Sequence, residues 1–141
     1  MNTIKLSKAN SIIRGVFKKA GDLGLRPLAV VVLDAGGHIK ALQTQDSAGF
    51  LKSKIALAKA YGSLGMGENS RLLGEKATQR PEHAAALNAI TDGNYMPVPG
   101  GVIIRNKTGQ VVGAVGVSGD LSDSDEQCAI WAVNHCGFST D

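Results

Sequence analysis

The stretch that most constrains the fold runs from Pro99 to Glu126. A proline–glycine entry leads into a short apolar run at 102–105, a four-residue turn, and a second run at 110–118 that is studded with glycine. Two such runs joined by a turn that ends in Gly109 predict a β-hairpin with a bulge, because glycine readily takes the left-handed conformation needed there. Acidic residues then open a segment whose spacing predicts a final helix.

The rest of the chain predicts another hairpin with helices around it. Apolar residues recur at helical spacing from an N-cap at Ser7 to Leu23, and two strands at 28–33 and 39–43 flank a glycine turn. Helices are expected at 50–63, at 71–79 and from Pro81 to Ile90. We therefore expect one domain over residues 1–141, of the α+β class, with a mostly antiparallel sheet of about five strands and helices packed on it.

Composition excludes several classes of partner. The 15 lysines and arginines form no block and the net charge is only +3, so we expect no nucleic-acid partner. No apolar run approaches the ~20 residues of a membrane span, so no membrane partner is expected. Cys128 and Cys136 would lie about 12 Å apart along a helix, too far for a disulfide, and predict reduced thiols. With no evident secretory signal, the expected location is the cytoplasm.

The glycines at 113, 116 and 119 have two interpretations. A dinucleotide-binding loop would need a following helix, a further parallel strand and an acidic residue about 20 positions on, and the sequence after Gly119 has no room for them. The acidic residues that follow would also repel a phosphate. The glycines therefore favour a helix lying close against the strand.

Two charged features have both a structural and a functional interpretation. Ser122 and Asp125 have the spacing of a helix capping box; alternatively, one carboxylate of this cluster turns inward as an acid, a base or a cation contact, with a raised pKa. Lys59 flanks the apolar stripe of its helix, as a surface lysine or as a partly buried amine that acts as a base or pairs with a carboxylate. Asp46, in the preceding loop, is the expected partner.

The histidines offer weaker signals. His38 lies in a glycine turn, where it can simply bond its own backbone, and His83 lies beside Leu87 on a helical face, as a half-buried structural histidine would. Either is otherwise an axial ligand for haem iron. No two histidines have the spacing of a metal site, and Met66 is a weaker candidate that also suits a packed core.

Several blocks carry a resemblance to a known family. They are residues 32–38 (VLDAGGH), 46–48 (DSA), 55–61 (IALAKAY), 99–102 (PGGV), 112–119 (VGAVGVSG) and 125–126 (DE). The chain resembles the GlcG/HbpS family, which includes the C-terminal domain of PduO-type proteins, over about residues 5–137. The resemblance implies a profilin-like α/β sandwich, homo-oligomers and, for some members, haem or iron binding; others belong to small-molecule catabolic operons.

One departure from the family pattern affects the ligand. The family commonly has Arg-Met-Asp-Gly-Ala before the second helix, whereas this chain has TQDSA at 44–48. Losing that arginine removes a bidentate carboxylate clamp, which leaves a ligand other than haem as an open alternative.

Three functions are therefore expected as alternatives. The first is a small-ligand-binding oligomer that holds haem or another planar catabolite among the Asp46 loop, the Lys59 helix and the loop at 99–101. The second is an isomerase, tautomerase or hydratase acting on a small carboxylate or carbonyl compound. The third is a non-catalytic assembly subunit. The candidate acid/base residues are Lys59, Asp46, Asp125 and Glu126; the ligand-binding candidates are Tyr61, Pro99, Gly100, Gly101 and Ser118; the candidate haem ligands are His38 and His83.

Overall fold

The computed structural model describes residues 2–140 and contains a four-stranded antiparallel sheet in the order β2-β1-β4-β3. The strands are β1 (Ala29–Asp34), β2 (Ile39–Thr44), β3 (Gly101–Arg105) and β4 (Val111–Ser118). The helices are α1 (Leu6–Leu23), α2 (Lys52–Met66), α3 (Ser70–Gln79), α4 (Pro81–Ile90) and α5 (Ser122–His135). The α+β class is confirmed, with four strands rather than five among the described residues.

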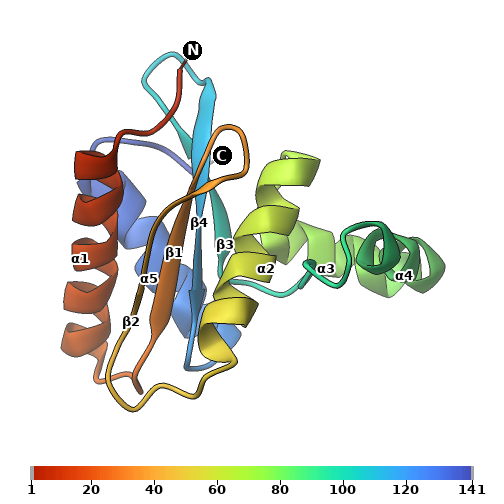
Figure 1. Cartoon of the computed structure of the whole chain (residues 1–141), viewed down its shortest axis with the longest axis horizontal. Helices are drawn as coiled ribbons and strands as arrows, with labels where there is room; N and C mark the ends of the chain where they lie inside the picture. The colour runs from red at the N-terminus through yellow and green to blue at the C-terminus, as the bar shows by residue number, and fades with distance from the viewer. Residues whose placement is uncertain (1, 141) are drawn as a thin grey trace.

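The sheet lies between two unequal layers of helix. Helices α1 and α5 cover one face side by side, and α2 alone crosses the other (Figure 1). The larger core lies on the α1/α5 face, where branched side chains such as Ile12, Val16, Val32 and Val115 are completely buried. Helices α3 and α4 do not cover the sheet; Figure 1 shows them extending away from it beyond α2.

Glycines allow α2 to lie almost directly on the strands beneath it. A Cβ atom on Gly116 would collide with the carbonyl oxygen of Ala56, and one on Gly101 would collide with the carbonyl oxygen of Lys59. Alanine also keeps this contact close, since Ala56 and Ala60 of α2 and Ala114 of β4 belong to one buried cluster with Val31 and Leu33. The close packing predicted for the glycine run is confirmed at Gly116.

The turn chemistry is confirmed more fully than the helix caps. Gly109 has φ +83°, and the register shifts between Ile104 and Arg105, as expected for a bulged hairpin. The cap prediction at Ser7 is wrong, because α1 begins at Leu6 and no side chain caps it. The capping box is also wrong: Leu121, not Ser122, precedes α5 without a side-chain cap, and the Asp125 carboxylate binds Lys59 and the Asp120 N–H. Within residues 2–140, no helix is both long and apolar enough to cross a bilayer.

Candidate functional site

Lys59 and Asp125 form a buried ion pair that connects α2 to α5 around the end of β4. The Lys59 Nζ atom lies 3.3 Å from Asp125 Oδ2 and donates a hydrogen bond of 3.0 Å to the Val117 carbonyl oxygen. The Asp120 backbone N–H donates to the other carboxylate oxygen at 3.1 Å. The two side chains are only 2% and 1% exposed. Asp125 is therefore the inward carboxylate that the sequence offered as an alternative to a cap.

Burial shifts both pKa values toward the neutral forms. Loss of solvent lowers the pKa of Lys59, and the Asp125 charge only partly opposes this. Loss of solvent likewise raises the pKa of Asp125, against the opposing charge of Lys59. The same environment raises the pKa of Cys128, one turn further along α5, to about 11. That thiol is therefore protonated and unreactive near neutral pH.

Glycine makes room for the lysine. A Cβ on Gly100 would stand 2.8 Å from Lys59 Nζ and 2.7 Å from the Val117 carbonyl oxygen, and Gly100 has φ +130°. Gly101 lies beneath the Lys59 backbone, and Ser118 is buried opposite Ala29 on the neighbouring strand. Five of the site residues predicted from the sequence therefore lie together, next to the loop that carries Pro99. They are Lys59, Asp125, Gly100, Gly101 and Ser118.

This convergence makes a packed junction rather than the pocket expected there. None of the four hollows described below is lined by Lys59, Asp125 or residues 99–101. The predicted Lys59–Asp46 pair is wrong, because Asp125 occupies that position. Asp46 instead lines a shallow hollow at the β2 edge with Phe17, Leu25, Pro27 and residues 43–45.

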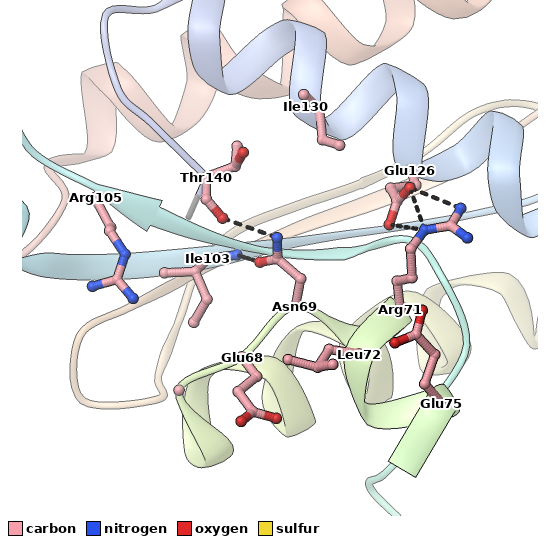
Figure 2. A pocket seen from close by; sticks show the side chains of 11 residues that line it. Glu68, Asn69, Arg71, Leu72, Glu75, Ile103, Arg105, Glu126, Ile130 and Thr140 are labelled. Atoms are coloured by element: carbon pink, nitrogen blue, oxygen red, sulfur yellow. Dashed lines mark hydrogen bonds and ion pairs between the residues drawn. The ribbon is translucent and has the colours of Figure 1, made fainter. Parts of the chain in front are cut away.

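The largest of these hollows, about 570 Å³, lies between α3, α5 and the free edge of β3 (Figure 2). We call it the α3–α5 groove. Two of its five charged side chains bind each other: Arg71 Nε donates to both Glu126 carboxylate oxygens, at 3.0 and 3.2 Å. Asn69 accepts from the Ile103 N–H at 2.8 Å and donates to the Thr140 carbonyl oxygen at 2.9 Å. Glu126, a candidate acid or base, is therefore engaged in an ion pair.

Two buried side-chain atoms in this groove lack hydrogen-bond partners among the described residues. They are Glu68 Oε2 and Arg105 Nε. Figure 2 shows these two side chains apart from each other along the groove. The Asn69 amide and the Ser70 hydroxyl meanwhile satisfy β3 backbone groups that an edge strand leaves free. The groove is thus largely a polar joint between elements.

A second hollow, of about 370 Å³, has a different character. It lies between α2, α4 and the β1–β2 turn, and we call it the α2–α4 groove. Its walls are mainly apolar and aromatic, and Thr91 supplies a hydroxyl. The lining residues are Ala35, Gly36, Gly37, Tyr61, Gly62, Leu64, Gly65, Met66, Leu87, Ile90, Thr91 and Tyr95.

Of the predicted ligand-binding residues, Tyr61 lies in this groove, and both candidate haem ligands flank it. His38 follows Gly37 at the groove's rim, and its Nδ1 lies 3.2 Å from Asp34 Oδ1. His83 is exposed on α4, not half-buried as its helical position suggested. It lines a small hollow of about 20 Å³ that shares Met66, Leu87 and Tyr95 with the groove.

Sequence reasoning missed most of the α2–α4 groove. In the sequence, Met66 is only a weak candidate ligand, and no motif marks Tyr95 or Thr91. Leu87 and Ile90 are three residues apart in α4 and therefore share one face of the helix. Their meeting with the glycines at 36 and 37 depends on how α4 folds back toward the β1–β2 turn, which no local pattern specifies.

Comparison with known proteins identifies the family of this architecture. A family model described as "Haem degrading protein HbpS-like" matches residues 4–134. The chain belongs to the HbpS-like family. An uncharacterized 15.0 kDa protein of Citrobacter freundii, from the dhaT-dhaS intergenic region, is 28% identical over 134 residues, covering 94% of this chain and 91% of that protein.

Solved structures agree with the HbpS-like assignment. A crystal structure of a double mutant of Streptomyces reticuli HbpS has a TM-score of 0.85 and 26% identity, covering 97% of this chain and 89% of the other. A crystal structure of a PduOC–haem complex has a TM-score of 0.87 and covers 98% of each chain. At 22% identity, this second likeness establishes the fold alone.

Proposed function

We propose that this HbpS-like protein binds a planar, mainly apolar small molecule, with haem as the leading ligand, in the α2–α4 groove. The observation that carries the proposal is the groove itself. It is concave and apolar, and its two tyrosines and a methionine suit the faces of a flat ring system. The family to which the chain belongs, and the haem in one structure of the same fold, make haem the first ligand to test.

The side chains around the groove suit haem iron as well as its ring. Histidine, tyrosine and methionine all serve as haem ligands. Of the two histidines, His38 is the candidate for iron, because Asp34 holds its Nδ1 and leaves Nε2 free to bind. Among residues 2–140, no cluster of three or more histidine, cysteine or acidic side chains could hold a bare metal ion. Bound haem would supply iron redox chemistry, while the protein's own part is to hold the ring and exclude water.

Two glycines with matched surroundings allow a clean test of the groove. Gly65 lines the groove and Gly21 lies on α1, both within helices, and a Cβ on either would meet nothing within 4 Å. Gly65→Trp should fill the groove without straining the backbone and weaken haem binding by about tenfold or more. Gly21→Trp should bind like the wild type. The measurement is a haem titration followed at the Soret band.

Two outcomes would overturn the proposal. One is a wild-type Soret band identical to that of free haem, and the other is equal affinity in both tryptophan variants. For the iron ligand, His38→Ala should change the spin state seen in the visible spectrum, whereas His135→Ala, on the α1/α5 side, should not. Equal spectra for the two alanine variants would remove His38 from the site.

The alternative enzyme, with Lys59 and Asp125 as acid and base, gains no support from the geometry. A general base must reach a substrate proton. Both groups are nearly inaccessible and each already has partners. Their role in proton transfer stays a prediction, and the ion pair explains them as a structural junction.

A further inference from the structure

The small hollow that His83 lines differs in chemistry from the groove beside it. Within residues 2–140, no lysine, arginine, aspartate or glutamate lines the α2–α4 groove itself. The hollow shares Met66, Leu87 and Tyr95 with the groove but adds Lys76 and His83, so we call it the Tyr95 hollow. Its volume of about 20 Å³ has room for one small polar group. The two spaces together form an apolar surface with a basic, hydroxyl-bearing end.

Tyr95 lines both spaces and packs closely on α2. A Cβ atom on Gly62 would lie 2.9 Å from Tyr95 Cδ1, so the absence of a side chain there lets the ring rest against the helix. Tyr95 is accordingly only 7% exposed. Loss of solvent and the nearby charge of Glu68 raise the pKa of Tyr95, and Lys76 only partly opposes them. The hydroxyl therefore keeps its proton near neutral pH and can donate it in a hydrogen bond.

Lys76, on α3, supplies the positive charge at this end. Its Nζ atom binds Glu68 Oε1, and the side chain is 55% exposed. An ammonium group has three N–H donors, so this bond leaves two for a ligand. Glu68 lines the α3–α5 groove rather than the Tyr95 hollow, so its carboxylate does not occupy the place that an anion would take. His83, on α4, adds a ring N–H as a further donor.

We propose that the Tyr95 hollow binds a carboxylate carried by the planar ligand, so that the α2–α4 groove selects flat acids over their neutral counterparts. The inference rests on the proposed function for the position of the ring. Tyr95 and Lys76 donate to the carboxylate, with His83 as a third donor, while the ring lies on the apolar wall of the groove. Hydrogen bonds to an ionised acceptor are about twice as strong as neutral ones. The ligand class is therefore a flat apolar molecule with an acidic arm, to which haem belongs through its propionates.

Haem and its dimethyl ester isolate this contact, because esterification removes the charge of the propionates and keeps the ring. Wild type should bind haem about tenfold more tightly than the ester in the Soret titration. Lys76→Met removes the ammonium group and should abolish most of that preference. Lys18 is the matched control, since it is 65% exposed and paired with Asp22 but lies on α1. Lys18→Met should keep the full preference.

The hydroxyl is tested by Tyr95→Phe, which removes one oxygen atom and leaves the ring against Gly62. Haem affinity should fall about fivefold, and the affinity for the dimethyl ester should fall less. Tyr61→Phe is the comparison, because Tyr61 lines the groove but not the Tyr95 hollow. Whatever its effect on the ring, it should change the affinities for haem and for the ester equally. Equal changes for both ligands in Tyr95→Phe would overturn the role of the hydroxyl.

A pair of probes without iron separates this inference from the proposed function. Naphthalene-2-carboxylate and naphthalene-2-carboxamide share a flat ring and differ in charge. In equilibrium dialysis, wild type should take up the acid in preference to the amide, and Lys76→Met should not. If this preference is found while the Soret band of haem stays that of free haem, selection for acids stands and the haem proposal fails.

Two results would overturn the inference while leaving haem binding intact. One is equal affinity of wild type for haem and for its dimethyl ester. The other is the same preference for haem in Lys76→Met as in Lys18→Met. Either result would show that the carboxylates of the ligand stay in water and that the groove recognises the ring alone.

Discussion

The two faces of the sheet are built on different principles. On the α1/α5 face, branched side chains fill a thick layer, and eighteen buried residues form one cluster. On the α2 face, glycine and alanine bring the helix backbone against the strand backbone, and the buried cluster has only five members. Apolar burial is the main stabilising term in folding, so the first face provides most of it. The second face depends on steric fit and on one ion pair.

The comparison explains why candidate functional features gather on one side. Helices α3 and α4 lie outside the main core, beyond the thinly packed α2 (Figure 1). The α2–α4 groove lies between α4 and α2. Segments with few buried apolar contacts are the ones that open at low free-energy cost and adapt to ligands. The α1/α5 side has the opposite property, a large packed core.

The largest effect should come from breaking the ion pair that supports the thin side. Lys59→Met leaves Asp125 buried without its cation, and we expect the free energy of unfolding to fall by about 3–5 kcal/mol. Adding Asp125→Leu should restore most of that loss, since an apolar pair needs no solvation. Urea unfolding of both variants at neutral pH measures the difference. Equal stability of the single and double variants would show that the charge is not what matters.

The single variant should also acquire a defined pH dependence. In the wild type, the positive charge of Lys59 partly offsets the rise in the pKa of Asp125 that burial causes. Without Lys59, this pKa rises further above its usual value. The folded state then binds a proton that the unfolded state has released, so stability falls as pH rises from the unfolded pKa through the folded one. Lys59→Met should therefore recover stability in mild acid. A loss of stability over the same range would contradict this account.

A somewhat smaller effect should come from the steric fit. Gly116→Ala places a methyl group against the Ala56 carbonyl oxygen and Ala60, so α2 must move away from β4. We expect a loss of about 3 kcal/mol, at the upper end of overpacking costs. Gly15, where α1 crosses α5, is the matched position on the thick face. Its Cβ would meet Ala132 Cβ at 3.1 Å, a side chain rather than a carbonyl, so Gly15→Ala should cost less. Equal losses would remove the distinction between the faces.

Much of the fold could be predicted because its signals are local. Both hairpins depend on turn residues and on short apolar runs, and Pro81 does begin α4. The expected fifth strand has no local signal behind it, because the sequence predicts strands only in the two hairpins. The wrong helix cap at Ser122 does have a local cause. Ser122 and Asp125 match a capping pattern, but the Asp125 carboxylate is held by a lysine 66 residues away.

The candidate site was predictable in its residues but not in its geometry. Lys59, Asp125 and the glycines at 100 and 101 do converge, yet they exclude a ligand because burial leaves no room beside them. The alanines and leucine of α4 suggest a buried helix, and only the structure shows that none of them is fully buried. The sequence pattern shows which side chains prefer burial. It does not show which surface covers them, because that depends on how distant segments pack.

The smallest effect sharpens the comparison at two exposed helical glycines. Replacing glycine by alanine within a helix stabilises it by roughly 0.5–1 kcal/mol, because the unfolded chain loses freedom. Gly21→Ala on α1 should show this gain with or without haem, since that position lies away from the groove. Gly65→Ala should show the same gain without haem and lose it when haem is added, because the added methyl group stands in the groove proposed to hold the ligand. Thermal unfolding with and without haem measures both. A gain at Gly65 that haem does not change would place the ligand outside the α2–α4 groove.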